Sequence, residues 1–245
     1  MKVDKKIVFI KDWILNYVNS MPVKAQSLVI GISGGIDSSV TSTLCAMTGL
    51  KTIVLTMPIK QIKEQNDLSL LHKKWLSDKF NNVESYSLKL DNVFKNFENT
   101  LSDFKNEHGM ANSRARLRMT TLYQVATANK GIVVGTGNKV EDFGVGFYTK
   151  YGDGGVDISP LADCNKTEVW ELGKELNILN EIIEAPPTDG LWDDGRTDEG
   201  QLGLSYKELE EAMDNEKSIN RDKYIKIRNA NLHKMNPIPV CKIPK

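Results

Sequence analysis

Short apolar runs alternate with longer segments of helical spacing along the first half of the chain. The runs predict buried strands at residues 27–33, 52–57, 83–88 and 132–136. The segments between them predict helices at 36–49, 62–79, 92–104 and 112–128. An amphipathic helix that packs on the domain is predicted near the N-terminus by an apolar stripe of Val8, Ile10, Ile14, Leu15 and Val18. This alternation predicts an α/β fold in which residues 1–245 form a single domain around a doubly wound, open parallel sheet with helices on both faces.

The second half of the chain has a different pattern. Residues 144–160 carry five glycines in 17 residues, too many for a helix interior, and predict a loop that binds a ligand. A helix is expected at 166–176, and the Pro-, Gly- and Asp-rich segment 184–203 is expected to be mobile. Two further helices are expected near 205–214 and 219–232.

Composition and charge exclude several classes of protein. Hydrophobic residues make up 40% and charged residues 26%, as in ordinary globular proteins. The 32 basic residues balance the 32 acidic ones, which argues against nucleic acid or an anionic membrane as a partner and requires any phosphate recognition to be local. Polar residues interrupt the N-terminal apolar stretch, which argues against a signal peptide or a membrane span. The cysteines Cys45, Cys164 and Cys241 lack CxxC spacing, so we expect reduced thiols in the cytoplasm.

The segment GISGGIDSS, residues 31–39, lies between a predicted strand and a predicted helix. Its backbone N–H groups and the helix N-terminus can converge on a phosphate, and the hydroxyls of Ser33, Ser38 and Ser39 add donors. Asp37 would repel phosphate unless a divalent cation lay between them, and Mg²⁺ is the usual cation at nucleotide phosphates. The loop matches neither GxxxxGK[ST] nor GxGxxG. It therefore predicts a Mg-nucleotide site that is neither a Walker A loop nor a dinucleotide Rossmann loop.

SGGIDSS resembles the pyrophosphate loop of the N-type ATP pyrophosphatases, which split ATP between its α- and β-phosphates. Within that superfamily, the order of five further segments is similar to that in ammonia-dependent NAD⁺ synthetases: NSRARLRMTTLYQVA, GTGNKVE, GFYTKYGDGGVDISPL, NKTEVWELG and DEGQLGLSY. The resemblance implies a Rossmann-like fold of the adenine nucleotide alpha hydrolase type and a homodimer with the dinucleotide site at its interface. It also implies a ligase that converts deamido-NAD⁺, ATP and ammonia into NAD⁺, AMP and pyrophosphate.

The resemblance also implies roles for individual residues. Asp37 and Glu141 would hold Mg²⁺, and Asp37 and Lys166 would be catalytic. The ATP contacts would be Gly31, Ile32, Ser33, Gly34, Gly35, Ile36, Asp37, Ser38, Thr136, Lys166 and Thr188, and the deamido-NAD⁺ contacts would be Arg116, Lys150, Asp157, His233 and Lys234. Without the resemblance, we would interpret Glu141, His233 and Lys234 as solvated surface residues. Arg114 and Arg118 read as salt-bridged or snorkelling side chains.

Chemical reasoning supports the roles of three of these residues. Thr136 and Glu141 follow a predicted strand, where the nucleotide site of a doubly wound sheet belongs. Lys166 opens a helix, and a cation there opposes the helix dipole unless an anion such as phosphate offsets it.

Two segments depart from the pattern of relatives. Ile36 stands where many have Gln, and GTGNKVE replaces GTDHAAE, which leaves the roles of residues 137–140 open.

The implied mechanism needs no protein nucleophile, because the nicotinate carboxylate would attack the α-phosphate and ammonia would attack the resulting acyl-adenylate. None of the three cysteines stands in a recognisable nucleophile setting, so we expect free ammonia, not glutamine, to be the nitrogen donor. Two alternatives remain at this point: another N-type ATP pyrophosphatase such as a tRNA-modifying enzyme, and a non-catalytic nucleotide-binding module. The charge balance and the lack of CxxC argue against the first.

Overall fold

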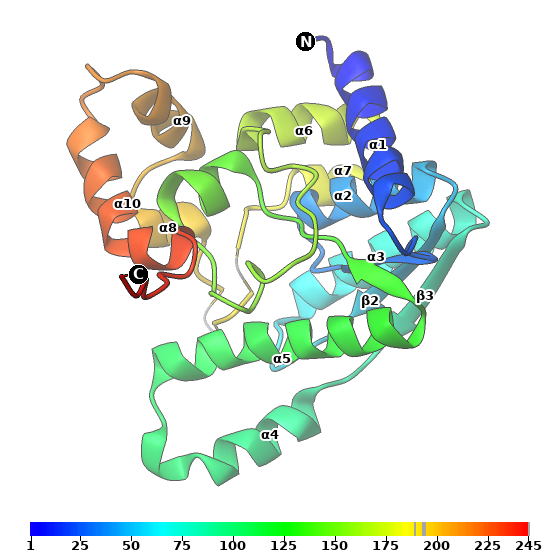
Figure 1. The fold of residues 1–245 in the computed structure, drawn as a ribbon, viewed down its shortest axis with the longest axis horizontal. Helices are drawn as coiled ribbons and strands as arrows, with labels where there is room; N and C mark the ends of the chain where they lie inside the picture. Colours follow the sequence, from blue (N-terminus) through cyan, green and yellow to red (C-terminus); the bar gives the residue numbers. More distant parts are fainter. Residues whose placement is uncertain (189, 193–194, 245) are drawn as a thin grey trace.

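The computed structural model describes residues 1–188, 190–192 and 195–244. Within this part, four parallel strands form one sheet in the order β3-β2-β1-β4 (Figure 1). Their bounds are β1 Ser27–Gly31, β2 Lys51–Thr56, β3 Val83–Ser87 and β4 Gly131–Val133. The chain leaves β1 toward β2 and β3 on one side and later returns to β4 on the other. The topological switch point, where ligands bind in open α/β sheets, therefore lies between the neighbouring strands β1 and β4.

Alternate residues of the central strands face opposite helix layers. Leu28 and Ile30 of β1 join one buried cluster with helices on the first face, namely α1 Val3–Ser20, α2 Ile36–Met47, α6 Lys166–Glu175 and α7 Asn180–Ile183. On this same face, Val54 of β2 packs with Leu76 of α3 Lys63–Lys79. Val29 faces the other way and packs with residues of α4 Asp91–Thr100 and α5 Glu107–Ala128. The predicted sheet covered by helices on both faces is thereby confirmed.

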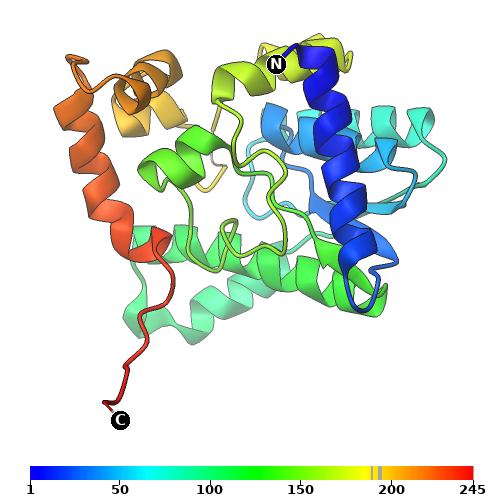
Figure 2. The ribbon, with the colours of Figure 1, turned by 45° about the horizontal axis from the view of Figure 1, so that its top comes forward.

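The C-terminal helices form a third layer beside the sheet. They are α8 Asp198–Leu202, α9 Tyr206–Asp214 and α10 Arg221–Met235. Their apolar residues pack on Val140 and Val145 of η2, a π-helix at Lys139–Val145. Figure 2 shows the chain after α10, as far as residue 244, extending away from the helices. This layer holds η2, and hence Glu141, next to the switch point.

Several predicted boundaries were wrong. Helix α5 begins at Glu107 and not at 112, because Asn106 caps it by accepting a hydrogen bond from the Gly109 N–H at 2.7 Å. The helix expected at 92–104 ends at Thr100 and is followed by a short 3-10 helix, η1 Ser102–Phe104. Strand β4 ends at Val133, and Val134 continues only as an isolated bridge to Ile158.

Other corrections concern exposure and regular structure. Val8 is 51% exposed, and the buried stripe of α1 instead contains Ile7 together with Ile10, Ile14 and Val18. The start of the glycine-rich segment belongs to η2, and the segment 184–203 includes helix α8. Residues 189, 193 and 194 of that segment lie outside the described residues. Among the helices of the described chain, none has the length and apolar character needed to cross a membrane.

Candidate active site

The loops that follow β1 and β4 meet at the switch point and enclose a cavity of about 260 Å³, called here the phosphate-loop cavity. The two chain segments are tied together where Val134 N–H donates to the Val29 carbonyl at 2.9 Å. All residues predicted to contact ATP line this cavity: Gly31, Ile32, Ser33, Gly34, Gly35, Ile36, Asp37, Ser38, Thr136, Lys166 and Thr188. Glu141 lines it as well. The structure thus brings together residues that are spread over more than half of the sequence.

The phosphate loop, residues 31–39, is held tightly against helix α3. Gly34 has a φ of 92°, and a Cβ atom at this position would lie 2.7 Å from the Gln65 carbonyl oxygen. Both facts require glycine. Ser33 and Ser38 lie with their hydroxyl oxygens 3.0 Å apart at the cavity wall. Ser39 corrects an expectation, because its hydroxyl is buried and donates to the Gly35 carbonyl at 2.9 Å, pointing into helix α2 and not toward a ligand.

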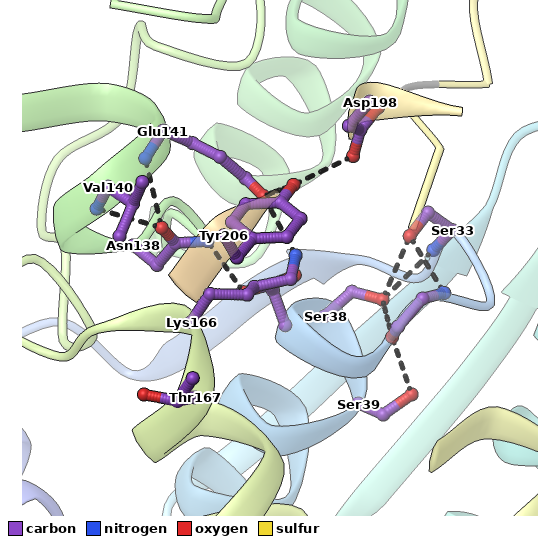
Figure 3. A network of polar contacts seen from close by, with 12 residues as sticks. Ser33, Ser38, Ser39, Asn138, Val140, Glu141, Lys166, Thr167, Asp198 and Tyr206 are labelled. Carbon is purple, nitrogen blue, oxygen red and sulfur yellow. Dashed lines mark hydrogen bonds and ion pairs between the residues drawn. The ribbon is translucent and has the colours of Figure 1, made fainter. Parts of the chain in front are cut away.

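The Lys166 ammonium lies between two carboxylates at the cavity wall (Figure 3). Its Nζ is 2.6 Å from Asp37 Oδ2 and 2.8 Å from Glu141 Oε1. The Lys166 side chain is only 3% exposed. We expected an anionic phosphate to offset the unfavourable position of this lysine at the start of α6, but the two carboxylates do so already. The fold thus preassembles a trio made of Lys166, Asp37 and Glu141.

The electrostatics of the trio follow from burial and mutual contact. Burial alone would lower the pKa of Lys166, but the adjoining Asp37 and Glu141 carboxylates raise it well above its ordinary value, so the ammonium stays charged. Burial raises the pKa of Asp37, aided by the negative charge of Glu141 and opposed by Lys166. Burial also acts to raise the pKa of Glu141, but Lys166 and hydrogen bonds from its neighbours outweigh burial and lower it.

Sequence reasoning missed three polar residues that surround this trio. The Tyr206 hydroxyl donates to Glu141 Oε1 and contacts Asp198 Oδ2 at 3.1 Å, so the tyrosine links helices α8 and α9 to the site. Burial, followed by the charges of Glu141 and Asp198, raises the pKa of Tyr206, which therefore remains a hydroxyl donor. Asn138 Nδ2 donates to Asp37 Oδ1 at 2.9 Å. Tyr206 and Asp198 occur in the segment DEGQLGLSY, but nothing in their spacing indicated contact with Glu141.

A second, larger cavity of about 970 Å³ adjoins the first. The side chain of Asp142 is part of both walls, which places the two cavities next to each other. Lys150 and Lys234, two of the residues predicted to contact deamido-NAD⁺, line the larger cavity. Lys234 is held there because its Nζ donates to the Tyr148 carbonyl at 2.6 Å, and the Tyr148 hydroxyl donates to the Lys234 carbonyl at 2.8 Å.

The other three residues predicted to contact deamido-NAD⁺ do not line the larger cavity. Arg116 is exposed, and its Nε donates to the Lys150 carbonyl at 3.2 Å. Asp157 accepts from the Val133 N–H at 2.7 Å and from the Tyr123 hydroxyl at 3.0 Å, and Tyr123 does line the cavity. His233 is exposed. Within a single chain, Arg116 and Asp157 therefore reach the larger cavity only through the lining residues Lys150 and Tyr123, and His233 does not line it.

The two neighbouring arginines make backbone contacts. Arg114 donates to the Leu191 carbonyl at 3.0 Å, and Arg118 donates to the Met57 carbonyl at 3.0 Å. Arg118 lines the phosphate-loop cavity, whereas Arg114 is buried beneath the segment that contains Leu191. The three arginines thus make their contacts in different regions of the protein.

The two carboxylates of the trio fit a hard cation. Asp37 and Glu141 supply carboxylate oxygens, the ligands that Mg²⁺ prefers, and Mg²⁺ at nucleotide sites takes its other ligands from phosphates and water. Among the described residues, no group of three or more His, Cys, Asp or Glu side chains is arranged to hold a metal by protein ligands alone. A cation here would therefore depend on the nucleotide that it accompanies.

Comparison with known proteins agrees with this arrangement. The profile of the NAD synthase family matches residues 6–241. The chain belongs to the NAD synthase family. One relative, the NH3-dependent NAD(+) synthetase of Mesoplasma florum, is 38% identical over 232 residues, which cover 92% of this chain and 91% of the relative.

Solved structures extend the agreement to the fold of this chain. An NMN synthetase from Francisella tularensis matches with a TM-score of 0.90 and 31% identity, over 99% of this chain and 100% of that one. An NH3-dependent NAD synthetase from Campylobacter jejuni matches with a TM-score of 0.78 and 25% identity, over 99% and 100% of the two chains. The fold class, the family and the ligase activity predicted from sequence are confirmed. A tRNA-modifying enzyme or a non-catalytic module is not favoured.

Proposed function

We propose that the two adjoining cavities divide the substrates of an ammonia-dependent NAD⁺ synthetase between them, with ATP in the phosphate-loop cavity and deamido-NAD⁺ in the larger one. The observation that carries this proposal is the shared wall at Asp142, because transfer of the adenylyl group of ATP to the carboxylate requires the two substrates to meet. The site residues predicted for ATP line the first cavity, and Lys150 and Lys234 offer cations to the second. Residues 1–245 would act as a single domain in this reaction.

The chemistry would consist of two displacements. An oxygen of the nicotinate carboxylate attacks the α-phosphorus of ATP, and the bond from that phosphorus to the bridging oxygen of pyrophosphate breaks. Ammonia then attacks the acyl carbon of the adenylate, the carbon–oxygen bond to AMP breaks, and the nitrogen loses a proton. Charge stabilisation and positioning are what the protein must supply.

Lys166 would supply the fixed positive charge. Its ammonium is buried, and its two carboxylate partners keep it protonated beside the phosphate loop. The backbone N–H groups at the start of α2 add donors for the phosphates. Asp37 and Glu141 would hold Mg²⁺, which when bound neutralises charge on the ATP phosphates. Lys166 and the loop amides are preorganised by the fold, which makes such stabilisation effective.

Deamido-NAD⁺ would be bound by direct and indirect contacts. Lys150 and Lys234 can pair with its pyrophosphate or carboxylate, and Arg116 has its Nη groups available beside Lys150. Asp157 would act by fixing Tyr123 in the cavity wall.

We retain the predicted homodimer, in which the exposed His233 and the exposed C-terminal residues Ile238, Val240 and Ile243 face a second copy. A cytoplasmic location also stays a prediction, based on the cysteine pattern.

One observation favours a second candidate substrate. The NMN synthetase of Francisella tularensis matches with a TM-score of 0.90, against 0.78 for the NAD synthetase of Campylobacter jejuni. The same site chemistry would amidate nicotinate mononucleotide, because that molecule carries the same carboxylate without the adenylate half.

Product analysis tests both candidates. The purified chain, freed of contaminating ammonium, is incubated with ATP, Mg²⁺ and deamido-NAD⁺ or nicotinate mononucleotide, and each mixture receives either ammonium chloride or glutamine. We expect equal amounts of NAD⁺, AMP and pyrophosphate from deamido-NAD⁺ and ammonium, and little product from glutamine. A higher kcat/KM for the mononucleotide would favour the second candidate. Formation of ADP, or efficient use of glutamine, would contradict the proposal.

A further inference from the structure

Asn138 occupies the point where the three elements that carry the catalytic trio meet. Its side chain is fully buried. The Nδ2 group donates to Asp37 Oδ1 of α2 at 2.9 Å, and the Oδ1 atom accepts the backbone N–H groups of Val140 and Glu141, each at 3.0 Å (Figure 3). The next residue, Lys139, donates its N–H to the Cys164 carbonyl at 2.9 Å, two positions before Lys166.

The orientation of this amide is set by its partners. Only the amide oxygen can accept hydrogen bonds from the two backbone N–H groups, so the NH₂ group must face the Asp37 carboxylate. One side chain therefore acts as donor and acceptor at the same time. As an acceptor, it caps η2 and so fixes the start of the helical turn that bears Glu141. As a donor, it fixes the carboxylate of Asp37 from the side opposite to the oxygen that contacts Lys166.

We infer that Asn138 is a positioning residue that sets the Asp37 and Glu141 carboxylates in register for the cation that accompanies ATP. The inference rests on the proposed function, but it assigns a role to one of the positions, 137–140, whose roles the sequence left open. Hydrogen-bonding partners of metal-binding carboxylates commonly change metal affinity or activity by about 10- to 100-fold when they are replaced. The amide is needed because aspartate lacks the donor, and serine is too short to reach Asp37 while it caps η2.

Two substitutions separate positioning from capping. Asn138→Asp keeps the shape and the acceptor for the cap, but it places an oxygen against Asp37. Asn138→Ser keeps a good helix cap and a neutral side chain, but it loses the contact with Asp37. Asn106→Asp is the matched control, because Asn106 caps α5 by the same kind of bond, to the Gly109 N–H, and lines neither cavity.

The measurements are ATP affinity by calorimetry with and without Mg²⁺, kcat and KM for deamido-NAD⁺, and the melting temperature. For both Asn138 variants we expect ATP affinity in Mg²⁺ and kcat to fall by at least about tenfold, while ATP affinity without Mg²⁺ and the KM for deamido-NAD⁺ change by less than about twofold. Asn106→Asp should match the wild type in these four values.

The inference is overturned if folded Asn138→Ser binds ATP in Mg²⁺ and turns over like the wild type. An equal loss of ATP affinity with and without Mg²⁺ would also overturn it, because general distortion of the cavity would then be the cause. If neither Asn138 variant folds, the residue is structural and the inference fails. If the wild type binds ATP but forms no NAD⁺, the proposed function fails, whereas the Mg²⁺-dependent ATP binding of the variants still decides the role of Asn138.

Discussion

Lys166 Nζ lies 2.6 Å from Asp37 Oδ2, although the two residues are 129 positions apart in the chain. The contact joins the start of α6 to the start of α2 across the switch point of the sheet. A lysine and an aspartate at helix N-termini have opposite effects on the helix dipole, so pairing them offsets the unfavourable lysine. The pair is therefore preorganised before any substrate enters.

Asp37→Asn should leave the fold intact and remove most turnover. The amide can still accept a hydrogen bond from Lys166, which also keeps its contact with Glu141, but it cannot neutralise a cation as a carboxylate does. We expect kcat to fall by about 100-fold or more, with a melting temperature near that of the wild type. Asp67→Asn, at an exposed carboxylate that pairs with Lys63, is the control and should keep full activity. Near-normal NAD⁺ synthesis by folded Asp37→Asn would refute the role of Asp37.

Arg116→Ala should affect one substrate more than the other. Its guanidinium donates to the carbonyl of Lys150, which lines the larger cavity, and hydrogen bonds to charged groups contribute about 1.5–3 kcal/mol. We expect the KM for deamido-NAD⁺ to rise by about 10- to 100-fold and the KM for ATP to change by less than about twofold. Lys105→Ala removes an exposed cation outside both cavities and serves as the control. Equal changes in both KM values would count against the assignment.

Tyr206→Phe should lower both stability and activity. The buried hydroxyl donates to Glu141 and contacts Asp198, and its loss leaves two buried carboxylates with one donor fewer. We expect the free energy of unfolding to fall by about 2–3 kcal/mol and kcat to fall by about tenfold. Tyr224→Phe is a close control, because that buried hydroxyl lies 3.5 Å from the Gly144 carbonyl and makes at best a weak bond. Denaturant unfolding of the two variants gives the comparison, and similar losses in both would contradict the role of Tyr206.

His72 should make the protein less stable in acid. Burial lowers the pKa of His72 from its ordinary 6.5 to about 4, and its Nε2 lies 2.9 Å from the Ser42 hydroxyl. The folded protein keeps His72 neutral, whereas the unfolded chain takes up a proton below pH 6.5. The stabilising contribution is therefore complete above pH 6.5 and is lost as the pH falls toward 4.

A substitution isolates this effect. The difference in unfolding free energy between the wild type and His72→Gln should shrink by about 2 kcal/mol from pH 7 to pH 5. Urea unfolding at the two pH values measures it. A difference that stays constant or grows over this range would show that His72 does not titrate in this way.

Local patterns made the strands, most helices and the phosphate loop predictable. Their signals are apolar periodicity and a glycine-rich turn, which need no knowledge of distant contacts. The start of α5 was predicted too late because Gly109 weakens the helical pattern, although Asn106 carried a capping signal. The contacts of Lys166, Tyr206 and Asn138 could not be read from the sequence, because each depends on elements that only the folded sheet brings together.

The fate of the substrate's carboxylate oxygen tests the central claim, which is that the substrate's carboxylate attacks the α-phosphorus of ATP. Deamido-NAD⁺ labelled with ¹⁸O in the nicotinate carboxylate is converted with ATP, Mg²⁺ and ammonium, and the products are separated and analysed by mass spectrometry. If the acyl-adenylate forms, one ¹⁸O atom leaves with AMP, the other remains in the amide of NAD⁺, and pyrophosphate is unlabelled. Unlabelled AMP, or ¹⁸O in pyrophosphate, would contradict the account.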